Sequence, residues 1–129
     1  MADKKNILFA AFEASPFIKT GGLGDVSGAL PAHLKNEEFD ARVILPLLSS
    51  IPEEYRSKMK YVTNYEVPLG WRSQYCGLFT LRKGGVMYYF LDNEYYFRRG
   101  KVYGEFDDAE RVAFFSKAVL ETIRYICGN

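Results

Sequence analysis

The chain has 129 residues, of which 48% are apolar and 26% are charged. This composition is typical of a soluble globular domain long enough to bury a hydrophobic core, and it excludes disordered, collagen-like and fibrous chains. Because 17 basic side chains are balanced by 16 acidic ones, the formal net charge is only +1, and no electrostatic argument favours nucleic acid or an anionic membrane as a partner.

The first predicted element is a buried strand over residues 6–12. Its sequence, NILFAAF, is a continuous apolar run of strand length, which is typical of a strand covered on both faces in a parallel sheet. Residues 13–24 follow with turn chemistry, because they contain Pro16 and three glycines.

A helix and a second strand are expected next. From Asp25 onward, apolar side chains at helical spacing predict one apolar face of a short helix; they are Val26, Leu30 and Leu34. Asp25 or the glycines before it could start this helix, and Pro31 would strain its interior, so we expect a kink or a late start. Residues 41–45 (ARVIL) predict a second buried strand that ends at Pro46. The succession strand, turn, helix, strand is a βαβ unit, and its crossover should be right-handed.

Three runs rich in Tyr, Val and Phe predict an antiparallel insertion over residues 61–67, 71–81 and 86–91. The breaks between them, at residues 68–70 and 83–85, are too short for parallel crossovers. Period 2 divides the second run into two faces, one with Trp71, Ser73, Tyr75, Phe79 and Leu81, the other with Arg72, Gln74, Thr80 and Arg82. The third run is apolar throughout, so we expect it in the interior of the sheet.

Residues 92–106 show no periodicity and predict a long polar loop of the kind that often carries function. Its cations, Arg98, Arg99 and Lys101, are expected to form a solvated face.

The clearest predicted helix starts at Asp107, which together with Glu110 resembles a capping box. Its apolar positions at helical spacing are Val112, Phe115, Val119, Ile123 and Ile126. Arg111 is expected to pair with a neighbouring carboxylate on this helix, and Gly128 is expected to stop the helix.

The fold class predicted from these elements is α/β, with a βαβ start, an antiparallel β insertion and a C-terminal helix. A doubly wound sheet usually needs more than two βα units, and this chain ends on a helix without a following strand. We therefore predict that residues 1–129 form a truncated Rossmann-like domain.

Cysteine usage and hydropathy predict a cytoplasmic protein without a metal. Cys76, Cys127 and His33 have neither disulfide nor metal-ligand spacing, so we expect ordinary structural roles for them. The apolar run at residues 7–12 is too short for a signal-peptide core followed by a cleavage site, and no stretch approaches the roughly 20 apolar residues of a membrane span.

The glycine-rich turn predicts an anion site. Gly21, Gly22 and Gly24 lie between a buried strand and a helix, where glycines let the backbone approach a ligand and aim N–H groups outward. The helix N-terminus and the Lys19 ammonium favour phosphate there, and they would stabilise a departing diphosphate. The residues alone leave open a plain strand-to-helix turn.

Two named nucleotide motifs do not fit this turn. The spacing Gly22-x-Gly24-x-x-x-Gly28 misses the dinucleotide fingerprint by one residue, and Asp40 lies at the start of the second strand rather than at its end. No Gly-Lys-Ser/Thr follows, so a P-loop fails as well.

The run ILFAAFEASPFIKTGGLGDVSGALPAHL resembles the opening of glycogen synthases and plant starch synthases, which are retaining glycosyltransferases with a two-domain GT-B fold. The residues that match the family pattern are Glu13, Pro16, Lys19, Thr20, Gly21, Gly22, Leu23, Asp25, Val26, Leu30 and Pro31. The chain departs from the pattern at Phe12, usually Ser, and at Gly24, usually Ala, and we expect neither to touch the chemistry. The resemblance continues in DARVILP at residues 40–46, RRGKVYG at 98–104 and DAERVAFFSKA at 108–118.

The resemblance implies roles for five substrate-binding residues. Lys19 would contact the donor diphosphate or the sugar beside it, and Gly21 and Gly22 would let the loop close over the donor. Asp25 would lie near the sugar, unless it is a plain helix N-cap, and Tyr103 would line the glucan side of the cleft, unless it is an ordinary loop tyrosine. Glu13 would at most orient the loop.

The resemblance also implies a reaction, in which the parent enzyme transfers glucose from ADP-glucose to the non-reducing end of an α-1,4-glucan with retention, without a cofactor. Most nucleotide contacts would come from a second domain beyond Asn129, so we expect no complete catalytic set and no activity in this chain alone. Two other interpretations are a stand-alone anion- or sugar-binding module and another nucleotide-dependent α/β enzyme such as an oxidoreductase.

Overall fold

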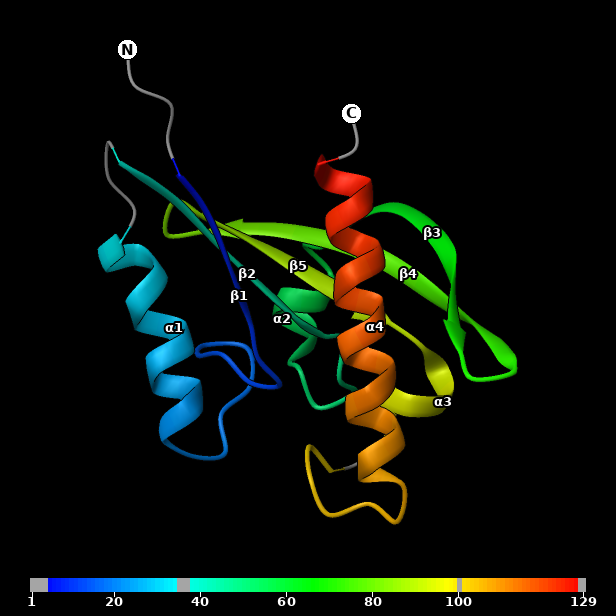
Figure 1. Cartoon of the computed structure of the whole chain (residues 1–129). Coiled ribbons are helices and arrows are strands. Elements are labelled where there is room, and N and C mark those ends of the chain that lie inside the picture. The colour runs from blue at the N-terminus through cyan, green and yellow to red at the C-terminus, as the bar shows by residue number, and fades with distance from the viewer. Residues whose placement is uncertain (1–4, 35–37, 100, 128–129) are drawn as a thin grey trace.

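The computed structural model describes residues 5–34, 38–99 and 101–127, and within them five strands form one sheet in the order β1-β2-β5-β4-β3 (Figure 1). The strands are β1 Lys5–Ala10, β2 Phe39–Pro46, β3 Lys60–Leu69, β4 Arg72–Lys83 and β5 Val86–Asp92. The helices are α1 Gly22–Leu34, α2 Glu53–Arg56, α3 Glu94–Phe97 and α4 Asp108–Cys127. Gly128, the expected helix stop, lies outside the described residues.

The sheet has a parallel half and an antiparallel half. β1 pairs in parallel with β2, and β2 pairs in parallel with β5. β4 is antiparallel to both of its neighbours, β5 and β3. In Figure 1, α4 crosses in front of the sheet, α2 lies behind it, and α1 stands beside β1 and β2. The expected βαβ start, antiparallel insertion and C-terminal helix are therefore confirmed.

β1 is less buried than its apolar sequence predicted. Its residues are half-buried at best, because β1 lies at the end of the described sheet and pairs only with β2. Full burial begins just after the strand, where Ala14 is 0% exposed and Phe12 is 8% exposed. The prediction of a strand covered on both faces is therefore wrong.

α1 begins at Gly22, one of the glycines before Asp25 that could start it, and it continues through Pro31, so the prediction of a late start is wrong. Its buried side is made of the small residues Gly24 and Ser27 together with Pro31, whereas the expected apolar face is largely exposed, with Val26 at 55%. Small residues face inward because the turn before the helix passes very close to it.

Both hairpins of the antiparallel half have two-residue connections. Leu69 pairs with Arg72, and Lys83 pairs with Val86. Gly84 and Gly85 both have positive φ, 59° and 77°, which the tight turns matched to strand twist require. β5 lies between β2 and β4, as expected, and all of its residues except Met87 are buried.

The segment expected to be a long polar loop contains a helical turn, α3. The Asn93 side chain accepts a hydrogen bond from the Tyr96 amide and caps it, and Tyr96 and Phe97 are fully buried. The run was too short and too rich in aromatic residues to show helical periodicity.

α4 was predicted correctly in place but not in all of its buried face. The carboxylate of Asp107 at its start pairs with Arg99, and that of Glu110 pairs with Arg72. The residues buried on α4 are Arg111, Phe114, Phe115, Ala118, Val119 and Thr122, whereas Val112 is 49% exposed.

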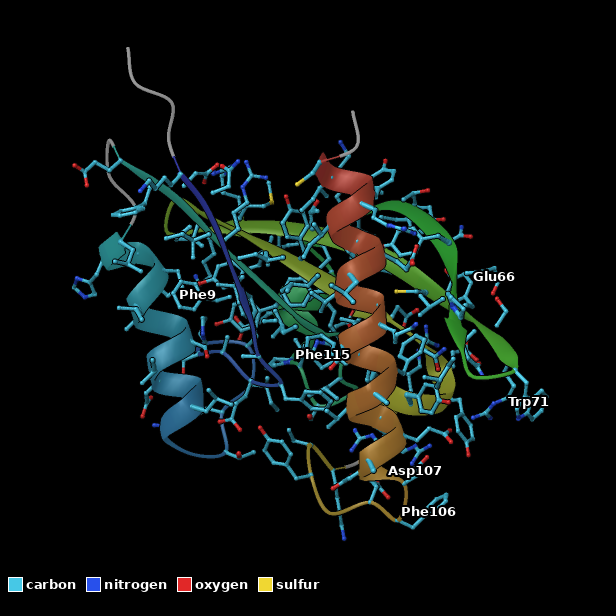
Figure 2. All side chains as sticks on the ribbon, viewed as in Figure 1. Phe9, Glu66, Trp71, Phe106, Asp107 and Phe115 are labelled. Carbon is cyan, nitrogen blue, oxygen red and sulfur yellow. The ribbon has the colours of Figure 1, made fainter. Side chains whose placement is uncertain are left out.

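Aromatic rings fix the end of β1 against α4. Phe12 meets Phe115 edge to face with 5.1 Å between ring centroids, and Phe97 at 6.2 Å (Phe115 is labelled in Figure 2). Burial of each such ring contributes roughly 1.5–3 kcal/mol to stability. This packing places the residue that follows Phe12 at the carboxyl end of the parallel strands.

Candidate functional site

Glu13 is the centre of the candidate site. It lies three residues after Ala10, the last residue of β1, is 2% exposed, and accepts five hydrogen bonds. Its Oε1 accepts from the amides of Thr20, Gly21 and Gly24 at 3.0, 3.1 and 3.0 Å. Its Oε2 accepts from the Thr20 hydroxyl at 2.6 Å and from the Tyr103 hydroxyl at 2.8 Å. One buried carboxylate therefore joins the glycine-rich turn to a loop far along the chain.

These hydrogen bonds keep Glu13 ionised. Burial alone raises the pKa of the Glu13 carboxyl, but hydrogen bonds from the Thr20 side chain and amide, the Tyr103 hydroxyl and the Gly21 amide outweigh it. The net effect lowers the pKa from 4.5 to about 2. The negative charge is thus present at any neutral pH and is satisfied from within the protein.

The direction of the turn's amides differs from the prediction. We expected N–H groups aimed outward at a ligand, but those of Thr20, Gly21 and Gly24 point inward at Glu13. A carboxylate of the protein occupies the anion position at the start of α1, which the helix dipole also favours. What faces outward is the exposed surface of Gly21 and Gly22, where a Cβ added to either residue would meet no atom within 4 Å.

Lys19 and Asp25 form an ion pair beside this surface. Lys19 Nζ lies 3.0 Å from Asp25 Oδ1, and both side chains are more than half exposed. Asp25 lies in the first turn of α1 rather than at its N-cap, because the helix begins at Gly22. An ion pair this exposed contributes about 0–1 kcal/mol. A ligand anion can therefore compete for Lys19 at little cost.

Tyr103 closes the other side of the cluster. Its ring stacks on Phe12 with 6.0 Å between centroids, and it remains 44% exposed. Burial and the hydrogen bond to Glu13 raise the pKa of Tyr103 to about 12, so the phenol stays protonated and acts as the donor.

The two residues that depart from the family pattern both contact the Glu13 cluster. Phe12 stacks on Tyr103. The Gly24 amide donates to Glu13, and an added Cβ there would lie 2.9 Å from Glu13 Oε1.

Arg111 holds the segment that presents Tyr103. It is 0% exposed, and its guanidinium donates to the carbonyls of Tyr96, Val102 and Lys101 at 2.8, 3.0 and 3.2 Å. The expected pairing with a carboxylate on its own helix is confirmed, at 3.0 Å from Asp108. The carbonyl contacts were not predicted, because no local pattern shows which backbone oxygens a distant loop brings to a buried cation.

The other three cations of this loop differ in how exposed they are. Lys101 is exposed, as predicted. Arg98 is half exposed and pairs with Asp92 and Glu94. Arg99 contradicts the prediction of a solvated side chain, because only 14% of it is exposed and it binds both oxygens of Asp107.

An apolar groove of about 470 Å³ adjoins the cluster. It runs between the end of β1, the start of α1 and α4, and its walls include Leu23, Tyr103, Val112 and Phe115. The structure thus brings all five predicted site residues, Lys19, Gly21, Gly22, Asp25 and Tyr103, into one cluster around Glu13. The sequence could have indicated Glu13 as the centre of this cluster, because Glu13 is the first charged residue after an apolar run.

The described residues contain no group of three or more His, Cys, Asp or Glu side chains that could hold a metal ion. None of the helices in the described part of the chain is long and apolar enough to cross a membrane.

Comparison with known proteins identifies clear relatives. The family model described as the starch synthase catalytic domain matches residues 6–129. A glycogen synthase of Clostridium novyi is 61% identical over 121 residues, which cover 94% of this chain and 25% of that protein. A glycogen synthase of Lactobacillus acidophilus is 55% identical over 88% of this chain and 24% of that protein.

A solved structure of a starch synthase has the same fold as this chain. The catalytic domain of starch synthase IV from Arabidopsis thaliana, bound to ADP and acarbose, matches with a TM-score of 0.83 and 27% identity. The match covers 95% of this chain and 25% of that one. The chain therefore spans about a quarter of the length of the relatives it matches.

Proposed function

The chain belongs to the starch synthase catalytic domain family, and from this premise we propose that its Lys19–Gly22 turn forms one wall of a nucleotide-sugar site. In the complete protein this site would transfer glucose from ADP-glucose to the non-reducing end of an α-1,4-glucan, with retention of configuration. The relatives named glycogen synthase and the ADP-bound structural neighbour support this assignment.

One observation supports the donor site most directly. The five hydrogen bonds to Glu13 fix the turn from inside, so that Lys19 and the open surface of Gly21 and Gly22 face outward. A diphosphate arriving there would displace the weak contact of Lys19 with Asp25. The Lys19 ammonium would then stabilise the negative charge that develops as the diphosphate leaves.

Asp25 and Tyr103 would bound the sugar on either side of the donor. Asp25, once released from Lys19, offers a carboxylate to a sugar hydroxyl. Tyr103 keeps its hydroxyl on Glu13 and presents its partly exposed ring to the apolar groove, where a glucan could lie.

The remaining three quarters of the relatives' length would supply the rest of the active site. We propose that residues 1–129 are part of an N-terminal domain and that a C-terminal nucleotide-binding domain supplies most donor contacts. On this proposal the chain alone does not transfer glucose, needs no cofactor, and belongs to a cytoplasmic enzyme.

The test is a titration of the isotope-labelled chain with ADP-glucose, followed by amide NMR shifts. We expect weak binding with shifts centred on Gly21 and Gly22. Lys19→Ala should abolish these shifts, whereas Lys58→Ala, which removes an exposed lysine after α2, should leave them. Equal shifts in the Lys19→Ala chain, or full transfer activity of a complete enzyme carrying that change, would overturn the role of Lys19.

A further inference from the structure

Phe12 places a large aromatic ring where the family pattern usually has Ser. It lies between the end of β1 and Glu13, and the chain there is held to the sheet, because the amide of Ala11 donates to the Ile44 carbonyl of β2 at 3.1 Å. The Phe12 side chain is only 8% exposed. Its ring is therefore part of the packed interior next to the candidate site.

Four side chains from later parts of the sequence surround the Phe12 ring. Tyr103 is stacked on it, with 6.0 Å between the ring centroids and 22° between the ring planes. Phe97 and Phe115 meet it edge to face, at 6.2 and 5.1 Å. The guanidinium carbon of Arg111 lies 6.0 Å from its centroid. Because Phe97, Phe115 and Arg111 are each at most 5% exposed, they form a rigid frame in which the Phe12 ring has little freedom to turn.

The hydrogen bond from Tyr103 to Glu13 does not by itself fix the Tyr103 ring. Residues 101–107, which include Tyr103, form neither helix nor strand, and an aromatic ring can turn about a single hydroxyl contact. The stack on Phe12 supplies a second constraint, because paired aromatic rings prefer a small set of mutual orientations. The hydroxyl contact thus fixes the tip of the Tyr103 ring, and the stack fixes its plane.

The Tyr103 ring, held in this way, is one wall of the apolar groove. Phe12 and Tyr103 both line the groove, and Tyr103 is 44% exposed. None of the described residues that line the groove carries a charge, and its polar side-chain groups are the hydroxyls of Tyr103 and Ser116. Such a wall favours the apolar face of a sugar ring over a phosphate, which would lose its hydration without gaining a partner. The groove therefore differs in chemistry from the Lys19–Gly22 turn beside it.

We propose that Phe12 is a positioning residue for the glucan acceptor, which acts by holding the Tyr103 ring in the plane that the glucan contacts. The identity of the ligand in the groove rests on the proposed function. A ring already held in its bound orientation loses less conformational entropy when the ligand arrives, so the ligand binds more tightly. A serine at residue 12 would leave Tyr103 without this stack. The constraint is therefore a feature of this chain rather than of the usual family pattern.

The experiment is a titration of the isotope-labelled chain with maltoheptaose, read from the amide signals of Tyr103 and Ser116 in the groove. Phe12→Leu is the main variant, because leucine refills most of the buried space but has no flat face for Tyr103 to stack on. We expect this change to raise the dissociation constant by about threefold to tenfold, the cost of ordering one side chain on binding. Phe12→Ser should act in the same direction.

Phe90→Leu is the matched control. Phe90 is a fully buried ring of β5 that contacts two other rings, at 5.1 and 6.5 Å, and it does not line the groove. This change also removes a ring from the core, yet it should leave maltoheptaose binding at the groove unchanged. ADP-glucose provides a second control. Its shifts at Gly21 and Gly22 should give the same dissociation constant in the wild type and in Phe12→Leu, because the Tyr103 hydroxyl still reaches Glu13.

A measurement on the wild type alone tests the proposal even if a variant fails to fold. Nuclear Overhauser contacts between the ring protons of Phe12 and Tyr103 should be present without ligand and should persist at saturating maltoheptaose. Their loss on binding would show that Tyr103 leaves the stack to meet the glucan, and the proposal would be overturned.

Equal maltoheptaose affinity in the wild type and in Phe12→Leu would also overturn the role of Phe12, while leaving the groove as an acceptor site. Failure of the proposed function gives a different result. If maltoheptaose shifts neither Tyr103 nor Ser116 in the wild type, the groove is not an acceptor site, and the role of Phe12 is overturned together with that part of the proposed function.

Discussion

The hydroxyl of Tyr103 donates a hydrogen bond of 2.8 Å to the Oε2 of Glu13, across 90 positions of the sequence. This bond connects the turn before α1 to the segment before α4, which are otherwise separate loops at the carboxyl edge of the sheet. The shape of the turn therefore depends on Tyr103, and Arg111 fixes the position of Tyr103 by donating to the carbonyls of the two residues before it.

Replacing Tyr103 by Phe should loosen the turn while keeping the stack on Phe12. The hydrogen bond has a charged acceptor but is partly exposed, so we expect a loss of about 1–2 kcal/mol in the free energy of unfolding. Urea unfolding gives this value, and amide shifts of Thr20 and Gly21 report the turn. Tyr125→Phe, near the end of α4, is the control and should leave both amide signals in place.

Glu13→Gln should show a pH-dependent defect. The pKa of Glu13 is about 2 in the folded chain and near 4.5 in the unfolded one, so its ionised form stabilises the fold above pH 4.5. That contribution, of the order of 3 kcal/mol, is lost as the pH falls from 4.5 through 2. The difference in unfolding free energy between wild type and Glu13→Gln should therefore shrink over this range.

Chemical unfolding at several pH values between 2 and 7 measures this difference. Glu66→Gln, a change of the same kind on the exposed face of β3, is the matched surface control. A gap between wild type and Glu13→Gln that stays constant down to pH 2 would contradict the role of the ionised carboxylate.

Local patterns were sufficient for most of the fold. The apolar runs, the short breaks and the helical spacing after Asp107 located the strands, the hairpins and α4, because each depends on neighbours in sequence. Burial was harder to predict. Val26 and Leu30 form an apolar stripe that is exposed, since the small side of α1 must face the turn at residues 13–16.

The candidate site was predictable in its members but not in its arrangement. The family pattern identified Lys19 and Tyr103, yet nothing in it shows that Glu13 binds the amides that a phosphate was expected to bind. Likewise, helical spacing was enough to assign Arg111 a carboxylate partner on its own helix. The three backbone carbonyls that accept hydrogen bonds from Arg111 lie in the chain before α4, and the path of that chain depends on the whole fold.

Arg111→Met should be among the most damaging single changes in the chain. It would leave three carbonyls without their donor in a buried position, and we expect a loss of about 3–5 kcal/mol. Arg124→Met changes a mostly exposed arginine on the same helix and should cost less than about 1 kcal/mol. Both values come from urea unfolding. Comparable losses in the two variants would show that the carbonyl contacts of Arg111 contribute little.

Gly28→Ala tests why the small face of α1 is turned inward. An added Cβ would lie 2.5 Å from the Ser15 carbonyl oxygen and 3.0 Å from the Ser15 amide nitrogen, and backbone atoms cannot move aside as a flexible side chain does. Alanine favours a helix over glycine by up to about 1 kcal/mol, but overpacking of this kind costs roughly 1–3 kcal/mol. The net result should be destabilisation, accompanied by shifts in the amides of the turn.

The matched control for this change is Gly22→Ala, in the first turn of the same helix, where an added Cβ meets no atom within 4 Å. That variant gains the helical preference without the contact, so its stability should equal or exceed that of the wild type. Thermal unfolding of the two variants side by side decides the matter. If Gly28→Ala is as stable as Gly22→Ala, α1 must be free to move away from Ser15. The Lys19–Gly22 turn, which connects Ser15 to α1, would then be less rigid than the Glu13 hydrogen bonds indicate.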